Sequence, residues 1–117
     1  MVATSFPERC IDALANALAS YRLPPIEFAV VQGRHEKYWY AKIVQKSLLV
    51  ELYVYPDEAG CALNKDGWKI FEKWDFSDDN DLIREFVAYV ISVLTMGPGV
   101  KDNSRVWGAL TPAPKTS

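Results

Sequence analysis

The chain contains one histidine, His35, and this residue is the first place to look for catalytic chemistry. His35 lies between Arg34 and Glu36 in a segment with the composition of a turn. A serine or cysteine nucleophile activated by a histidine base would have to use it, and no such nucleophile lies near it in the sequence. The sequence also contains no phosphate-binding glycine loop, dinucleotide-binding motif, nucleophile elbow or H-E-x-x-H zinc motif. We therefore expect His35 to be a solvated turn residue, and we expect no enzymatic activity.

Few residues are available to hold a metal ion through nitrogen or sulfur. A catalytic zinc site takes three protein ligands, mostly histidine or cysteine, whereas this chain offers His35 and two distant cysteines, Cys10 and Cys61. The acidic segment 75–81 departs from the EF-hand calcium loop, because its sixth residue is an asparagine and not the required glycine. We expect no metal or other cofactor. The cysteines are expected to be reduced, buried thiols, unless their Cα atoms come within about 7 Å.

The same acidic segment has two interpretations that do not involve a metal. Asp75, Asp78, Asp79 and Asp81 directly precede or begin a predicted helix. Aspartates at this position cap the first turn and complement the positive end of the helix dipole. The alternative is an acidic patch that contacts a basic partner, and the sequence leaves both interpretations open.

Aromatic residues form the second group with a candidate role. Tyr38, Trp39 and Tyr40 are consecutive in a predicted strand, so they point to both faces of a sheet. Only one face packs against the core, so either the two tyrosines or Trp39 point into solvent. Tyr53 and Tyr55 pose the same question in the next strand. These rings are either ordinary half-buried strand aromatics or a surface for protein binding or dimerisation, where tyrosine and tryptophan are enriched.

Two helices and a set of strands must position these residues. Ser5 and Glu8 have the spacing of a capping box with Pro7 in the first turn, which predicts a helix that ends before Pro24-Pro25. A second helix is predicted from Ser77 or Asp78 to about Gly97, because an apolar stripe at helical spacing fills this segment. Between the helices the apolar period is two, which predicts strands at 26–31, 37–45, 48–55, 61–63 and 68–76.

The short connections between these strands favour antiparallel neighbours, since a parallel crossover needs a dozen or more residues. We therefore predict a single α+β domain over residues 1–97. It consists of an N-terminal helix, an antiparallel meander of about five strands and a C-terminal helix. The result is a two-layer sandwich with both helices on one face of the sheet. Residues 98–117 are predicted to be an irregular tail, partly docked, in which Trp107 either packs on the domain or faces a partner.

Composition and charge narrow the class of protein. The 117 residues are 50% hydrophobic and 24% charged, with a formal net charge of −2. These values exclude a disordered chain and disfavour two ordinary domains or a direct nucleic-acid binder. The sequence shows no signal-peptide pattern and no apolar stretch near the roughly 20 residues that span a bilayer. We expect a cytoplasmic protein that does not contact a membrane. Its charge is divided between a basic segment at 34–46 and an acidic segment at 51–85.

Two families share parts of this pattern. The order helix–strands–helix is superficially similar to a double-stranded-RNA-binding domain. That family grips phosphates with lysines at the start of its second helix, where this chain has aspartates at 78, 79 and 81. In size, acidic charge and opening helix the chain is similar to type III secretion chaperones, which bind partner proteins as dimers. It departs from that family because no further strands or third helix follow the second helix.

The function expected from the sequence is therefore a non-catalytic protein-binding module. The first hypothesis is a small stoichiometric inhibitor, immunity-like or a phage anti-defence protein. It would block another protein, including one that binds nucleic acid, through an acidic and aromatic surface, and a homodimer through the sheet is a separate expectation. The alternatives are a secretion-type chaperone or adaptor that holds a partner segment, and a small-ligand binder or enzyme with an unrecognised cleft.

Overall fold

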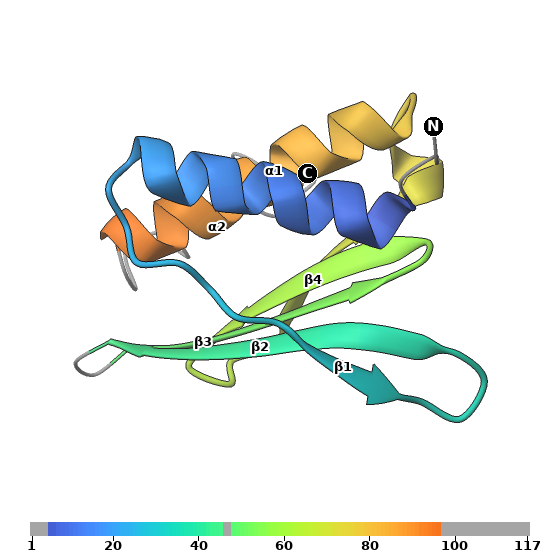
Figure 1. The fold of residues 1–117 in the computed structure, drawn as a ribbon, viewed down its shortest axis with the longest axis horizontal. Coiled ribbons are helices and arrows are strands. Elements are labelled where there is room, and N and C mark those ends of the chain that lie inside the picture. The colour runs from blue at the N-terminus through green and yellow to red at the C-terminus, as the bar shows by residue number, and fades with distance from the viewer. Residues whose placement is uncertain (1–4, 46–47, 97–117) are drawn as a thin grey trace.

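Five antiparallel strands in sequential order form one sheet, and both helices lie on the same face of it (Figure 1). The structure is a computed structural model that describes residues 5–45 and 48–96. In chain order the elements are α1 (Phe6–Ser20), β1 (Ala29–Gln32), β2 (Lys37–Gln45), β3 (Leu48–Tyr55), β4 (Glu58–Leu63), β5 (Trp68–Glu72), the short 3-10 helix η1 (Lys73–Asp75) and α2 (Asp79–Met96). The predicted α+β meander between two helices is confirmed.

Helix α1 begins at the predicted capping box. The Glu8 carboxylate accepts from the Ser5 backbone N–H at 3.0 Å, and the Ser5 hydroxyl oxygen accepts from the Glu8 N–H at 3.4 Å. The helix ends at Ser20, before the two prolines, because Arg22 adopts a left-handed conformation with φ 59°. The backbone N–H of Leu23 then donates to the Leu18 carbonyl oxygen at 2.8 Å, which closes the last turn.

Three strands differ from the prediction in their bounds, β1 at both ends and β4 and β5 at one end each. β1 spans Ala29–Gln32, because its pairing with β2 starts at Ala29 opposite Tyr40, and residues 26–28 do not pair although β2 continues to Gln45. Pro56 and Asp57 alone make the β3–β4 turn, so residues 58–60, predicted as loop, belong to β4. β5 ends at Glu72, and η1 then carries the chain from the sheet to the helix layer. An alternating sequence pattern indicates an extended chain. It does not indicate at which residue pairing with a neighbouring strand begins or ends.

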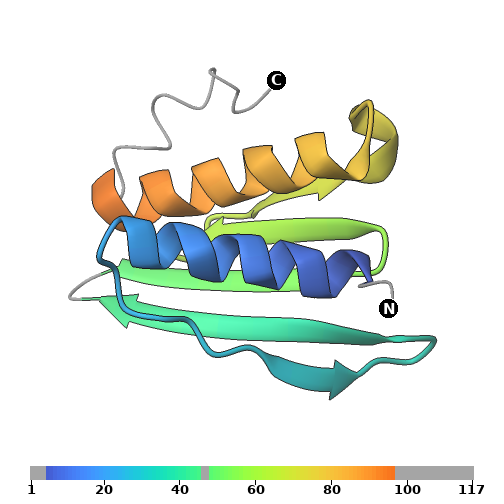
Figure 2. The ribbon, with the colours of Figure 1, turned by 45° about the horizontal axis from the view of Figure 1, so that its top comes forward.

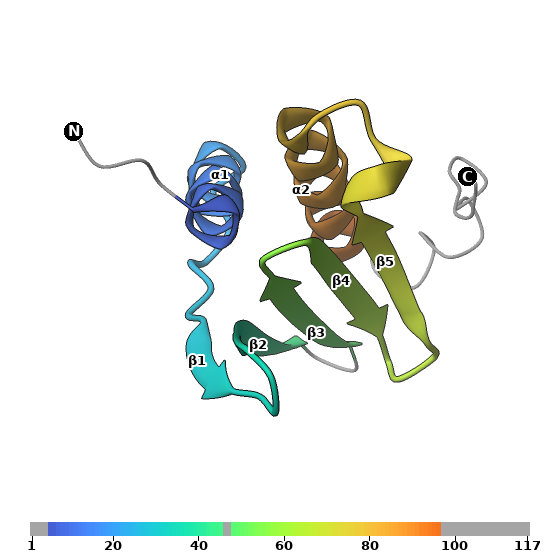
Figure 3. The same cartoon turned by 90° about the vertical axis from the view of Figure 1, so that its right-hand side faces the viewer.

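The hydrophobic core lies between the sheet and the two helices. On the middle strand β3 the residues alternate between buried and half-buried, and Val50, Leu52 and Val54 are fully buried. Figures 2 and 3 show α1 and α2 side by side above this face, running in the same direction. The largest fully buried side chains of the helices are those of Leu14, Leu18, Leu82, Phe86, Val90 and Val93. The two-layer arrangement therefore leaves the other face of the sheet without a covering element in the part of the chain that the structure describes.

Some predictions fall outside that part. The end of the second helix at Gly97, the turn at 46–47 and the tail 98–117 with Trp107 lie outside the described residues. Among the helices that are described, none has both the length and the apolar character to cross a membrane.

Candidate functional site

The face of the sheet that points away from the helices carries most of the tyrosines. In the strand register Tyr40 is opposite Tyr53, and Trp39 is opposite the buried Val54. The structure thus settles the question that the sequence left open, because Trp39 packs against the core while Tyr38 and Tyr40 point outward. We call this surface the outer face. By register it comprises Ala29, Val31, Tyr38, Tyr40, Lys42, Val44, Leu49, Glu51, Tyr53, Tyr55, Glu58, Gly60, Ala62, Trp68, Ile70 and Glu72.

Four aromatic rings on the outer face form a continuous row. The ring centroids of Tyr38 and Tyr55 are 4.8 Å apart, those of Tyr55 and Tyr53 are 5.3 Å apart, and those of Tyr53 and Trp68 are 4.9 Å apart. These separations are in the range of favourable aromatic pairs. The aromatic row therefore runs from β2 across β3 to β5.

Gly60 on β4 allows the row to cross a strand. A Cβ atom at this position would lie 2.4 Å from Cε2 of Tyr53, which is closer than two nonbonded carbon atoms approach each other in proteins. The Tyr53 ring therefore occupies the space that a side chain would fill on β4, and from there it reaches Trp68 on β5. A glycine inside a strand commonly marks such a close approach.

Hydrogen bonds fix two of the tyrosine hydroxyls on this face. Tyr40 Oη donates to Glu51 Oε2 at 2.7 Å, and Tyr53 Oη donates to Glu58 Oε2 at 2.8 Å. The bond to Glu51, together with burial, raises the pKa of Tyr40 to about 12. Burial and the bond to Glu58 raise the pKa of Tyr53 further. Both hydroxyls are therefore neutral donors at physiological pH, and both carboxylates are held in a fixed orientation.

Two glutamates lie directly opposite each other beside the aromatic row. Glu58 on β4 pairs in register with Glu72 on β5, so two negative charges share one position of the outer face. Partial burial and the nearby Glu58, Asp75 and Asp57 carboxylates raise the pKa of Glu72. The ion pairs of the described residues involve neither glutamate. This end of the outer face therefore has a negative potential.

A hollow of about 390 Å³ adjoins the same end of the row, between the β1–β2 turn and the β3–β4 turn. It contains His35, which is exposed in its turn as the sequence predicted. Three carboxylates and one guanidinium group line it, so it offers a net negative environment to a ligand. The lining residues are Gly33, Arg34, His35, Glu36, Tyr55, Asp57 and Glu58.

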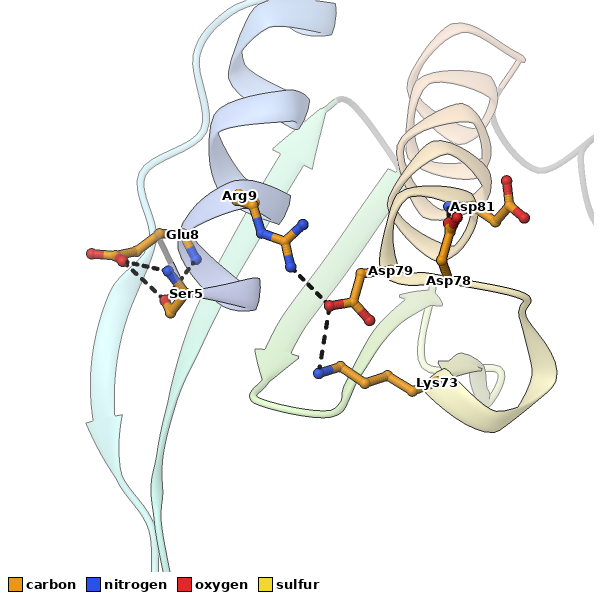
Figure 4. A network of polar contacts seen from close by, with 7 residues as sticks. All are labelled: Ser5, Glu8, Arg9, Lys73, Asp78, Asp79 and Asp81. Atoms are coloured by element: carbon orange, nitrogen blue, oxygen red, sulfur yellow. Dashed lines mark hydrogen bonds and ion pairs between the residues drawn. The ribbon is translucent and has the colours of Figure 1, made fainter. Parts of the chain in front are cut away.

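The acidic segment at 75–81 lies elsewhere, at the start of α2 in the helix layer (Figure 4). Asp79 Oδ2 accepts from Arg9 of α1 at 2.8 Å and lies 3.8 Å from Nζ of Lys73. This carboxylate therefore links the first turns of both helices to η1, a contact that spacing in the sequence did not reveal.

The other aspartates of this segment have local roles. Asp78 precedes α2, and its Oδ1 accepts from the Asp81 backbone N–H at 2.9 Å, which is the predicted helix cap. The Asp81 carboxylate accepts from Ser77 and Arg84, and these bonds lower its pKa. Asp75 is exposed at the end of η1. The contact of these four aspartates with a partner stays a prediction, as does that of Tyr38, Tyr40, Tyr53 and Tyr55.

Sequence reasoning missed several parts of the outer face. Gly60, Trp68 and the pair of Glu58 and Glu72 were not recognised as neighbours of the tyrosines. Alternation in β5 places Trp68 and Glu72 on one face, but only the strand register brings that face next to β3.

A second surface depression lies on the helix layer. A groove of about 500 Å³ runs between α1 and α2, with small residues of α1, Ala13 and Ala17, facing Ile83, Val87 and Ile91 of α2. Its lining is mainly apolar, and its polar members are Tyr21, Asn80, Arg84 and Ser92. Among the described residues it therefore offers one cationic group, whereas the outer face offers opposed carboxylates and a row of stacked rings.

The thiols and the acidic groups of the described residues do not form a metal centre. No cluster of three or more histidine, cysteine, aspartate or glutamate side chains suited to a metal ion occurs within 5–45 and 48–96. Cys10 and Cys61 are buried free thiols, as predicted. Burial raises the pKa of Cys10 to about 12 and that of Cys61 still further, so neither is a reactive thiolate at neutral pH.

Comparison with known proteins adds no relative: the chain matches no protein-family model, no curated protein and no solved structure. Its function is therefore inferred from the geometry of the outer face.

Proposed function

We propose that the chain is a non-catalytic protein-binding module whose contact surface is the outer face of the sheet. The observation that carries this proposal is the aromatic row of Tyr38, Tyr55, Tyr53 and Trp68, with its ring contacts of 4.8–5.3 Å. Tyrosine and tryptophan dominate the binding energy of protein interfaces. Rings that are already held against one another lose little conformational entropy when a partner binds.

The apolar character of the outer face supports the same proposal. The solvent-facing side of an antiparallel sheet is ordinarily polar. Here Val44, Trp68 and Ile70 are 68%, 44% and 45% exposed on that side. Val44 lies on β2, whereas Trp68 and Ile70 lie on β5, where Trp68 continues the aromatic row. Exposed apolar and aromatic side chains on a sheet face are typical of protein interaction surfaces.

The narrower form of the proposal is a stoichiometric inhibitor of the immunity-like or phage anti-defence kind. Glu51, Glu58 and Glu72 make the outer face acidic around its aromatic row, so it could compete with phosphates for a basic site on a nucleic-acid-binding partner. This form predicts that the partner loses activity in a linear titration that ends at one chain per site. If the partner stays active when it is saturated with the chain, the inhibitor form is rejected and only the binding role is kept.

A chaperone or adaptor role is a second candidate, because β5 is an edge strand of the sheet formed by the described residues, with Trp68 and Ile70 exposed. An extended partner segment that pairs with such an edge adds a strand to the sheet. This candidate predicts that binding protects backbone amides of β5 from hydrogen exchange, whereas face-on binding protects few of them.

Affinity capture from the native host tests the proposal with three full-length baits. These are the wild type, Tyr38→Ser/Tyr55→Ser, and the control Tyr21→Ser, which changes a tyrosine that is 62% exposed at the end of α1. Circular dichroism and thermal unfolding check that all three baits are folded. A protein that the wild type and the Tyr21→Ser control retain, and that the outer-face variant loses, supports the proposal. Equal retention by all three baits contradicts it.

A further inference from the structure

We infer that the outer face receives an arginine-bearing segment of a partner protein. Its guanidinium groups stack on the aromatic row and pair with the carboxylates at the Glu58 end. This inference rests on the proposed function and names the chemistry of the partner. It follows from three features of the outer face that lie side by side.

The first feature is the aromatic row itself. Tyr55 touches both Tyr38 and Tyr53, so the rings form a platform that crosses several strands. Cations are attracted to the faces of aromatic rings, and the planar guanidinium group also stacks on them. Arginine suits both features better than lysine, because its planar guanidinium group can stack on a ring and donate two parallel hydrogen bonds to a neighbouring carboxylate.

The second feature is the charge of the outer face. Of its three glutamates, Glu51 is opposite Lys42 and lies 3.9 Å from Nζ of Lys65, so the excess negative charge lies at Glu58 and Glu72. Glu58 and Glu72 are directly opposite each other, an arrangement that destabilises a sheet when both are ionised. Tyr53 nevertheless holds the Glu58 carboxylate in place at 2.8 Å. A guanidinium group that binds there relieves the repulsion, because its N–H groups donate two parallel hydrogen bonds to carboxylate oxygens in a fixed geometry.

The third feature is the hollow at the end of the row. Tyr55 and Glu58 belong both to the outer face and to the lining of this hollow of about 390 Å³. Glu36 and Asp57 add two carboxylates from the two turns, and the basic side chains of the lining are those of Arg34 and His35. The hollow thus offers one aromatic wall and an excess of negative charge, which suits the head of an arginine side chain.

Charge complementarity favours an arginine-bearing segment over two other possible partners, a second copy of the chain and a nucleic acid. A second copy of the chain would bring the same three glutamates against themselves, and a nucleic acid would bring phosphates against them. A partner rich in arginine brings opposite charge to each of these groups.

The test uses the full chain, labelled with nitrogen-15, and two probes of equal length and charge: a nona-arginine peptide and a nona-lysine peptide. Amide shifts locate the binding site, and titrations give the dissociation constants. The key variant is Glu58→Gln/Glu72→Gln, in which a glutamine at 58 still offers an acceptor to the Tyr53 hydroxyl. The matched control Asp12→Asn/Glu85→Gln removes two exposed carboxylates from the helices and changes the net charge by the same amount.

We expect the arginine peptide to shift Tyr38, Tyr55 and the Trp68 indole, and to bind about tenfold more tightly than the lysine peptide. Glu58→Gln/Glu72→Gln should abolish that preference, and the control should keep it. Equal affinity for both peptides overturns the inference, as does a footprint centred on 78–81. A homodimer formed through the outer face would also overturn the inference. Light scattering would then show a dimer for the wild type and a monomer for Tyr38→Ser/Tyr55→Ser.

The captured partner separates this inference from the proposed function. Loss of capture with Tyr38→Ser/Tyr55→Ser but not with Glu58→Gln/Glu72→Gln rejects the arginine segment and leaves the binding face in place. If both variants still capture the partner, both the arginine segment and the proposed binding face are rejected.

Discussion

The ring of Tyr53 lies where a side chain of residue 60 would lie: a Cβ on Gly60 would be 2.4 Å from Tyr53 Cε2. This relationship connects the middle strand β3 to Trp68 on β5, across β4 at the one position of that strand that has no side chain. Because the Tyr53 hydroxyl also donates to Glu58 on β4, one ring organises both the aromatic and the acidic part of the outer face.

Substitution of Gly60 by alanine should disturb this arrangement. The added methyl group must displace the Tyr53 ring, so the ring contact with Trp68 and the bond to Glu58 weaken. We expect the free energy of unfolding to fall by about 1–3 kcal/mol, the usual cost of overpacking. Urea unfolding of Gly60→Ala, Tyr53→Ala and the double variant measures the coupling. Additive effects of the two changes would show that the ring does not occupy the space above Gly60.

Removal of the Glu72 charge should stabilise the fold at neutral pH. The pKa of Glu72 is raised in the folded protein by partial burial and by Glu58, so its ionised form opposes folding. A carboxyl group with a raised folded pKa lowers stability above that pKa, and this loss disappears as the pH falls below the ordinary value of 4.5. Glu72→Gln should therefore gain roughly 0.2–1 kcal/mol at pH 7 and nothing near pH 4. Urea unfolding at both pH values checks this, and an equal gain at both would contradict it.

The Tyr40 hydroxyl should ionise only at high pH, because it donates a hydrogen bond to the Glu51 carboxylate. The bond to Glu51 and burial raise the pKa of Tyr40 to about 12. Glu51→Gln keeps an acceptor but removes the charge, so this pKa should move back toward 10. Carbon-13 NMR of labelled tyrosines measures each pKa separately. Glu58→Gln is the control, since its carboxylate bonds Tyr53 and not Tyr40. An unchanged Tyr40 titration in Glu51→Gln would reject the assigned bond.

Asp79 should contribute to stability through its two cations and its position in the first turn of α2. Arg9 and Lys73 both approach its Oδ2 atom, at 2.8 and 3.8 Å. We expect Asp79→Asn to cost about 1 kcal/mol, with a smaller cost at high salt. The control Asp12→Asn removes an exposed carboxylate from α1 and should change stability by less than about 0.5 kcal/mol. If the two variants were equally stable in thermal unfolding, Asp79 would have no structural role.

Local patterns were sufficient for the parts of the fold that depend on neighbours in sequence. The capping box of Ser5 and Glu8 uses residues three positions apart, and both of its hydrogen bonds are present. The Asp78 cap of α2 is equally local. The alternation in β3 also separated Tyr53 and Tyr55 from the buried Leu52 and Val54, as the structure confirms.

The candidate site depends on contacts that no local pattern contains. Tyr53, Gly60 and Trp68 meet only because two hairpins place three strands in one register. The bond from Arg9 to Asp79 joins residues 70 positions apart and follows from the packing of two helices. The sequence alone could have shown that Tyr38 and Tyr40, and not Trp39, point into solvent. Lys42 shares a face with the two tyrosines, and a lysine favours the solvent side of a sheet.

The most direct test of the binding face is its footprint in a complex. Amide and indole NMR signals of the nitrogen-15-labelled full chain are compared before and after addition of the captured partner. The outer face predicts changes at Tyr38, Tyr55 and the Trp68 indole, with the helix groove around Ala17 and Ile91 unchanged. Changes confined to that groove, with the aromatic row unaffected, would contradict the account.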